Sequence, residues 1–231
     1  MGGEKIIVAG VDEAGRGCVI GPLVICAFAC DSDWEPELRR MGVKDSKQLT
    51  AQRRQELAVK LRKIGKHVLV KITAEQLSKE MSSKSLNEIE AEHAAQALNE
   101  LQEKLSVKGN EFEKIFVDSP DPVPSLFEKR LRKYLVGKTG KARIVSENKA
   151  DAKYACCSAA SILAKVERDA EIEKIKKLVG SEFGSGYSSD LVTQEFLCKH
   201  FNDEAVKPFL REKWETVKRL RCKQMDLSKF V

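Results

Sequence analysis

Histidine is scarce in this sequence, and so are the cysteine arrangements that bind metals or build disulfide frameworks. The three histidines are scattered along 231 residues, which leaves little basis for a histidine general base or a histidine-containing triad. The seven cysteines are an odd number without a Cys-x-x-Cys pair, and we interpret them as reduced, mostly buried small residues. Any catalytic chemistry must therefore come from carboxylates.

Long apolar runs are also missing. The longest, from Cys18 to Cys30, has 13 residues and contains Gly21 and Pro22, whereas a membrane-spanning helix needs about 20. The first residues show no basic region followed by a cleavage site, and Ile6 stands where a myristoylation signal requires Ser or Thr. We therefore expect a cytoplasmic protein.

Charge is plentiful in both signs, with 41 basic and 35 acidic residues and a net charge of +6. The distribution is uneven, because residues 207–231 hold eight basic and three acidic residues, a net of +5, and residues 1–206 hold only +1. This basic segment fits either a solvated charged helix or contact with a nucleic-acid backbone. The length predicts one sizeable domain with an appendage.

Hydrophobic periodicity predicts an initial hairpin followed by strands that alternate with helices. Two capping boxes, Thr73 to Gln76 and Ser85 to Glu88, mark helix starts, and small residues open a long helix near Ala155. The order predicts an α/β fold with a mixed sheet. The expected strands are 5–11, 19–29, 67–72, 114–117 and 143–145, and the main helices are 50–64, 85–105, 125–134 and 154–178.

Four carboxylates stand where predicted strands end or a helix begins. Asp12 and Glu13 follow the first strand, Asp118 ends another, and Asp151 precedes the small-residue helix. Clustered carboxylates repel one another unless a divalent cation binds them, whereas each one alone is equally typical of a turn or a helix N-cap. Since neighbouring residues of a strand point to opposite faces, Asp12 and Glu13 share a site only if the chain bends after them.

A glycine-rich loop follows the first two carboxylates. Gly15 and Gly17 let backbone N–H groups approach an anion, and the cation Arg16 lies between them. A dinucleotide-binding loop would need glycine where Ile20 stands, and the chain has no Gly-Lys-Ser/Thr sequence for nucleotide phosphates. The loop suits a phosphodiester or a sugar beside a carboxylate-bound metal, or it is simply a tight hairpin turn.

Several sequence blocks combine into one pattern that covers about residues 5–215. The first is Val11-Asp-Glu-Ala-Gly-Arg-Gly17, with Gly-Pro-Leu-Val shortly after it. The others are Lys44-Asp-Ser-Lys47, Val117-Asp-Ser-Pro120, Lys149-Ala-Asp-Ala-Lys-Tyr154, Ser158-Ala-Ala-Ser-Ile162 and Gly184-Ser-Gly-Tyr187 with Asp190. In content and order these blocks closely resemble the type 2 ribonucleases H, the ribonuclease HII family, and most of all its archaeal branch.

The resemblance implies an RNase H-like mixed sheet flanked by helices in residues 1–179 and a helical C-terminal extension in residues 180–223. It also implies two-metal catalysis, in which two divalent ions about 3.5–4 Å apart, Mg²⁺ or Mn²⁺, are bound by carboxylates. The family's catalytic, metal-binding residues correspond here to Asp12, Glu13, Asp118 and Asp151.

The implied activity is endonucleolytic hydrolysis of the RNA strand of RNA–DNA hybrids, with nicking 5′ of ribonucleotides embedded in duplex DNA. The products would carry 5′-phosphate and 3′-hydroxyl ends, and a monomer with a role in replication and repair is expected. The family's substrate-binding residues correspond to Gly15, Arg16, Gly17, Lys47 and Tyr187. Two departures from the family pattern, at Cys18-Val-Ile and at Cys156-Cys157, change no predicted metal ligand.

The sequence closes on Gln224-Met-Asp-Leu227-Ser-Lys-Phe230-Val231. One helical turn would bring Leu227 and Phe230 together as apolar anchors for a groove. Residues 224–231 thus resemble the peptide by which replication and repair enzymes bind the sliding clamp PCNA, with Gln224, Leu227 and Phe230 as the contact residues. Val231 departs from the usual second aromatic residue.

Two other hypotheses stay open on the sequence alone. Another carboxylate nuclease of the same superfamily, such as a resolvase or an integrase, would not require a 2′-hydroxyl group in its substrate. A non-catalytic hybrid-binding protein is disfavoured, because clustered negative charge gives no advantage in binding phosphates.

Overall fold

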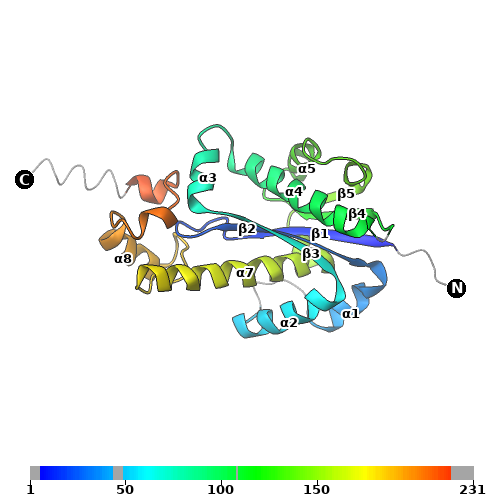
Figure 1. Ribbon diagram of the computed structural model, residues 1–231, viewed down its shortest axis with the longest axis horizontal. Coiled ribbons are helices and arrows are strands. Elements are labelled where there is room, and N and C mark those ends of the chain that lie inside the picture. The colour runs from blue at the N-terminus through cyan, green and yellow to red at the C-terminus, as the bar shows by residue number, and fades with distance from the viewer. Residues whose placement is uncertain (1–5, 44–48, 108, 220–231) are drawn as a thin grey trace, which may run out of the picture. The chain divides into compact units, whose positions relative to one another are not determined.

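The computed structural model of the chain describes residues 6–43, 49–107 and 109–219, and it contains a five-stranded mixed sheet (Figure 1). The strand order is β3-β2-β1-β4-β5. Strand β1 pairs antiparallel with β2 and parallel with β4, which pairs parallel with β5. The strands are β1 (Ile7–Ala14), β2 (Leu23–Asp31), β3 (Lys66–Ile72), β4 (Phe112–Asp118) and β5 (Arg143–Glu147). The predicted α/β class with a mixed sheet is confirmed.

Eight α-helices accompany the sheet in the described part of the chain. They are α1 (Glu35–Arg40), α2 (Ala51–Ile64), α3 (Ala74–Glu80), α4 (Leu86–Ser106), α5 (Pro124–Arg132), α6 (Ala150–Lys153), α7 (Ala155–Val179) and α8 (Leu191–His200), with short 3₁₀ turns at Ser32–Trp34, Thr139–Lys141 and Lys207–Phe209. None of these helices is long and apolar enough to cross a membrane.

Helix starts follow the capping signals of the sequence. The hydroxyl of Thr73 accepts the N–H of Gln76, and the Gln76 side chain accepts the N–H of Thr73, which completes the predicted capping box. At Ser85 only the first of these two bonds forms. The Glu88 carboxylate instead accepts hydrogen bonds from the side chains of Arg130, Lys133 and Tyr134.

The chain divides into two compact units. The first contains Met1–Ala14, Val24–Val70 and Ser85–Glu167, and the second contains Gly15–Leu23, Lys71–Lys84 and Arg168–Val231. The sequence passes from the first unit into the second between Ala14 and Gly15, one residue after the Asp-Glu pair. The division at 179 and 223 expected from the resemblance stays a prediction.

In the first unit, helices α1 and α2 cover one face of the sheet and α4 and α5 the other (Figure 1). The start of α7 lies directly against β1, because a side chain at Gly10 would overlap the backbone of Cys156 and Cys157. The thiol of Cys157 also donates to the carbonyl of Phe116 at 3.1 Å. Small residues open α7 because its backbone packs against the strand that carries Asp12.

The second unit has its own apolar core. Val19 and Ile20 pack with Ile172 and Ile175 of α7 and with Phe183, and further apolar residues come from α8 and the segment after it. Six cysteines lie in the described part of the chain; all are free and five are buried, as expected.

Candidate active site

Three of the four predicted carboxylates meet at the carboxyl ends of the parallel strands. Val11 of β1 pairs with Val117 of β4, so the residues that follow them, Asp12 and Asp118, lie side by side. Asp151 comes from the short helix α6, which follows β5. Oxygen atoms of Asp12, Asp118 and Asp151 all lie within 4.8 Å of one another. Crevices at the carboxyl ends of such strands are the usual ligand sites of open α/β sheets.

The backbone around Asp151 is held in an unusual conformation. Lys149, the residue at the N-cap of α6, has a φ of +59°, a left-handed value that is uncommon for residues other than glycine. The N–H of Ala150 donates to Oδ1 of Asp118 at 2.9 Å, so the start of α6 is tied directly to β4. This strained turn thus brings Asp151 next to Asp118.

The carboxylate group is electrostatically unfavourable without a cation. Burial raises the pKa of Asp12 well above its usual value, and the negative charges of Glu13 and Asp118 raise it further. A hydrogen bond from Ser161 acts in the opposite direction. A divalent cation would favour the ionised form of all these groups, and carboxylate oxygens are the ligands that Mg²⁺ and Mn²⁺ prefer. The donor set therefore fits a divalent metal.

Glu13 lies outside the group of three. Regular pairing of β1 with β2 continues through Glu13 and Ala14, beyond the break expected at residue 12. Because neighbouring residues alternate between the two faces of a strand, Glu13 does not share the position of Asp12. Its charge is still close enough to raise the pKa of Asp12, and its role as a ligand stays a prediction.

The Gly-Arg-Gly turn begins the second unit. Gly15 has a φ of +86°, and a side chain there would lie 2.7 Å from the carbonyl oxygen of Pro22. A Cβ atom at Gly17 would lie 3.5 Å from the ring of Tyr187. The turn therefore needs glycine at position 15, and at Gly17 it lies against the predicted substrate-binding tyrosine.

Tyr187 is held beside this turn by its own loop. It forms a β-bridge with Cys18, and the guanidinium carbon of Arg168 lies 4.9 Å from the centre of its ring. Burial raises the pKa of the Tyr187 hydroxyl, which therefore stays protonated at neutral pH. Asp190 accepts hydrogen bonds from the N–H and the hydroxyl of Ser185, both at 2.7 Å, and so closes the loop that carries Tyr187.

Arg211 contacts the Gly-Arg-Gly turn, which its sequence did not predict. It was counted with the basic segment 207–231, for which a solvated helix was one interpretation, yet its side chain is completely buried. It donates to the carbonyls of Arg16 and Gly21. Nothing in its local sequence signals burial. Lys47, Gln224, Leu227 and Phe230 lie outside the described residues.

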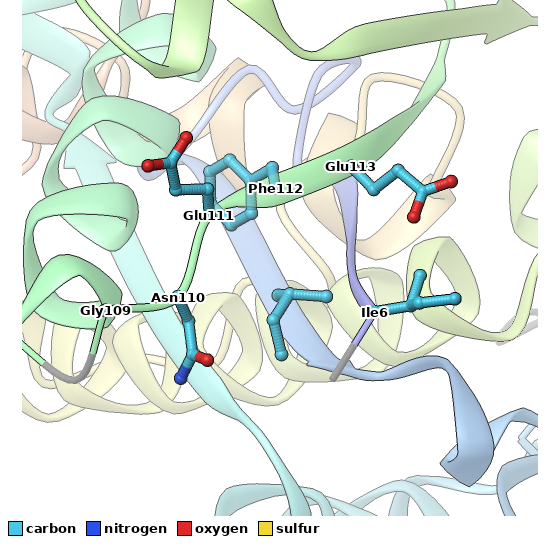
Figure 2. A pocket seen from close by; sticks show the side chains of 7 residues that line it. Ile6, Gly109, Asn110, Glu111, Phe112 and Glu113 are labelled. Carbon is cyan, nitrogen blue, oxygen red and sulfur yellow. The ribbon is translucent and has the colours of Figure 1, made fainter. Parts of the chain in front are cut away.

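A separate hollow lies at the other end of the parallel strands (Figure 2). It is lined by Ile6 and Ile7 at the start of β1 and by residues 109–113 at the start of β4. It shares no residue with the carboxylate group. The acidic side chains on its rim are already paired, Glu111 with Lys138 and Glu113 with Lys114.

Solved structures define the class of fold. The structure of Bst-RNase HIII in complex with Mn²⁺ is similar with a TM-score of 0.80 at 20% identity, covering 95% of this chain and 70% of that one. The ribonuclease H2 of Pyrococcus horikoshii OT3 is similar with a TM-score of 0.82 at 43% identity, covering 94% and 98%. The sheet is thus that of the RNase H-like proteins.

Sequence comparison then gives the family. The family model of ribonuclease HII matches residues 9–217. The ribonuclease HII of Archaeoglobus fulgidus is 44% identical over 218 residues, which are 94% of this chain and 98% of the relative. The PCNA:RNase HII complex from the same organism matches with a TM-score of 0.78 at 44% identity, covering 93% and 96%. The chain belongs to the ribonuclease HII family, and the predicted enzyme class, type 2 ribonuclease H, is confirmed.

Proposed function

We propose that the protein is an endonuclease that hydrolyses the RNA strand of RNA–DNA hybrids and nicks duplex DNA 5′ of embedded ribonucleotides. The products would carry 5′-phosphate and 3′-hydroxyl ends, as in removal of primers or misincorporated ribonucleotides. The observation that carries the proposal is the meeting of Asp12, Asp118 and Asp151 within 4.8 Å. Family membership supports the substrate class.

In this proposal the three aspartates, with Glu13 beside them, hold two divalent ions, Mg²⁺ or Mn²⁺. The chemistry that such a pair supplies is activation of water and stabilisation of the leaving oxygen. The protein's part is to hold the ligands rigidly: Asp118 is fixed by the N–H of Ala150, and Asp12 is buried in β1. Burial also excludes bulk water, which strengthens the electrostatic interactions of the site.

Selectivity for RNA requires a group that senses the 2′-hydroxyl. We assign this part to Gly15, Arg16 and Gly17 with Tyr187, because a turn with glycine on both sides of Arg16 leaves its backbone accessible to a sugar. The Tyr187 ring against Gly17 offers an aromatic surface at the same place. Lys47 is proposed as a further phosphate contact.

The decisive test is a DNA duplex that contains one ribonucleotide, incubated with Mg²⁺ or Mn²⁺, with the product ends mapped. We expect one nick on the 5′ side of the ribonucleotide and none in EDTA. The matched control is the same duplex with deoxyribose at that position, which should stay intact.

The same assay separates the alternatives. Equal cleavage of the all-DNA control would contradict the requirement for a 2′-hydroxyl and favour a resolvase-like or integrase-like nuclease. Binding without cleavage in either metal would favour a non-catalytic hybrid-binding protein.

Residues 224–231 suggest a partner as well, and we propose that they bind a sliding clamp of the PCNA type. The motif Gln224, Leu227 and Phe230 supports this, and so does the PCNA:RNase HII complex of the Archaeoglobus fulgidus relative. Truncation after Lys223 should abolish binding to the PCNA of that organism, measured by calorimetry, and leave cleavage of short hybrids intact. Substitution of Met225 by alanine, outside the motif, is the control. Unchanged binding by the truncated protein would contradict the proposal.

A further inference from the structure

The largest fully buried side chain of the described residues belongs to a cation. Arg211 is 0% exposed, and its guanidinium carbon lies 4.8 Å from the centre of the Trp214 ring. Its Nε donates to the carbonyl of Gly21 at 3.0 Å, and its Nη1 donates to the carbonyl of Arg16 at 3.0 Å. One guanidinium group thus bridges the two ends of the segment that contains Gly17.

The buried positive charge of Arg211 is not balanced by an ion pair. None of the ion pairs of the described residues includes Arg211, and the titratable groups that act on it are Cys18, Tyr187 and Arg168. Burial lowers the pKa of Arg211 to about 10, so it stays protonated at neutral pH. Its Nη2 is buried without a hydrogen-bond partner. A buried charge on backbone carbonyls alone is costly, and such exceptions need a specific explanation.

The bond to Arg16 has a direct geometric consequence. The carbonyl of Arg16 and the N–H of Gly17 belong to one peptide group, and the described chain contains no cis peptide bond. In a trans peptide the C=O and N–H bonds point in opposite directions. A carbonyl held inward by a buried donor therefore turns the N–H of the exposed Gly17 outward.

Arg168 acts on the other side of the same turn. Its Nη1 donates to the carbonyl of Ser185, and the ring of Tyr187 covers its guanidinium. Its side-chain Cγ lies 3.2 Å from the position that a Cβ atom of Gly15 would occupy. Unlike Arg211, it has a carboxylate partner, Asp169, at 2.8 Å. Arg168 therefore supports Tyr187, whereas Arg211 supports the Gly-Arg-Gly turn.

We propose that Arg211 is a positioning residue for ribonucleotide recognition, which acts by fixing the Arg16–Gly17 peptide so that its N–H faces the substrate. The proposal rests on the proposed function, since it specifies how the Gly-Arg-Gly turn selects its substrate. The guanidinium does not touch the substrate. Its uncompensated charge also favours approach of a polyanion to the turn.

The test compares Arg211→Met, Arg211→Lys and the control Arg132→Met, which removes an exposed arginine of the first unit paired with Glu128. Cleavage of the single-ribonucleotide duplex gives kcat and KM, and calorimetry with Mn²⁺ reports on the carboxylates. We expect Arg211→Met to raise KM roughly ten-fold to a hundred-fold, the effect of losing charge-assisted hydrogen bonds. Binding of Mn²⁺ should be unchanged, and Arg211→Lys, which can reach one carbonyl, should restore part of the loss.

A purely structural role would lower kcat in proportion to the folded fraction, measured by circular dichroism, with KM unchanged, and that result would overturn the proposal. A second readout keeps it separate from the proposed function. This readout is the Kd for the all-DNA duplex divided by the Kd for the ribonucleotide duplex, both measured in EDTA. The ratio should fall towards 1 in Arg211→Met and should keep its wild-type value in Arg132→Met. If wild-type protein cuts neither duplex, the proposed function is wrong, whereas a ratio equal in wild type and Arg211→Met refutes the role of Arg211.

Discussion

Asp12 of the carboxylate group stands shortly before the Gly-Arg-Gly turn in sequence, yet the two regions carry opposite charges. Asp12, Asp118 and Asp151 gather negative charge within 4.8 Å, whereas the turn is supported by Arg168 and by Arg211, which has no carboxylate partner. The first region suits a cation and the second a polyanion. In the proposed function, the aspartates that bind metal therefore belong to the first unit, and the turn and Tyr187 that recognise the ribonucleotide belong to the second.

The two regions also differ in how their residues are held. The aspartates stand at the ends of regular strands and on a helix that follows one, so strand pairing alone brings Asp12 to Asp118. The turn does not belong to a regular strand pair. Arg211, which supports it, lies 195 residues further along the chain than Arg16. Substitutions in the first region should therefore affect chemistry, and those in the second should affect binding.

The largest effect is expected for Asp118→Asn. We predict a loss of kcat of about 10³-fold, the order seen when a preorganised electrostatic group is removed, with affinity for the hybrid retained or increased. The melting temperature of the metal-free protein should rise, because the charge of Asp118 is one of those that raise the pKa of Asp12. Single-turnover cleavage, anisotropy and calorimetry measure the three quantities.

The matched control is Asp33→Asn, an exposed aspartate after β2. It should change none of the three quantities beyond error. Retained turnover by Asp118→Asn would exclude that residue from the chemistry.

The second effect is on folding, at the strand that carries Asp12. In Gly10→Ala the new methyl group would overlap the backbone of Cys156 and Cys157, which cannot move aside as a side chain can. We expect a loss of about 3 kcal/mol in the free energy of unfolding, at the upper end of overpacking effects. Urea denaturation provides the measurement.

Gly140→Ala is the control for this substitution, since the nearest atom to its new methyl group would be 3.5 Å away, an ordinary contact. It should be within about 0.5 kcal/mol of wild type. Equal stability of the two variants would contradict the close packing of α7 on β1.

What the sequence predicted well were features with a local signal. Thr73 caps a helix as expected, and the small residues after Tyr154 do pack closely. Asp12, Asp118 and Asp151 could be grouped because each follows a recognisable strand or precedes a helix. The family motifs gave the turn and Tyr187.

The features that the sequence did not predict depend on contacts with residues far away in the chain. Glu88 had the spacing of a capping box, but Arg130 and Tyr134 compete for its carboxylate. The strand was expected to break before Asp12, whereas pairing with β2 extends it through Glu13. Arg211 has the local sequence of a solvated residue, and only the fold reveals its burial.

The third effect is expected on substrate binding. Gly15→Ala would place its methyl group 2.7 Å from the carbonyl of Pro22 at a φ of +86°. We predict a rise of KM of roughly ten-fold on the ribonucleotide duplex, since a non-glycine residue in this region costs about 1–2 kcal/mol and the turn must shift. Binding of Mn²⁺, measured by calorimetry, should be unaffected.

Gly180→Ala carries the same backbone penalty in the same unit, with a φ of +70° and no atom near the new methyl group. It should lower stability without changing KM. A fall in Mn²⁺ affinity in Gly15→Ala alone would show that the two regions are not independent.

The smallest effect concerns the loop that carries Tyr187. Hydrogen bonds from Ser185, first its N–H and then its hydroxyl, lower the pKa of Asp190 to about 2, and Asp190 also caps α8 through the N–H of Val192. Asp190→Asn should cost about 1 kcal/mol in the free energy of unfolding at pH 7, because asparagine can still cap α8 but loses the second acceptor oxygen that Ser185 needs. Glu204→Gln, at an exposed carboxylate, should cost nothing measurable.

The sign of the pH dependence follows from the lowered pKa. An aspartate that is more acidic in the folded protein stabilises it fully above the unfolded value of about 3.9, and this contribution disappears as the pH falls towards about 2. The difference in melting temperature between wild type and Asp190→Asn should be constant from pH 7 to 5 and should shrink below pH 4. A difference that grows on acidification would mean that the folded protein stabilises the protonated form of Asp190. The hydrogen bonds from Ser185 to the ionised carboxylate would then not be what closes the loop.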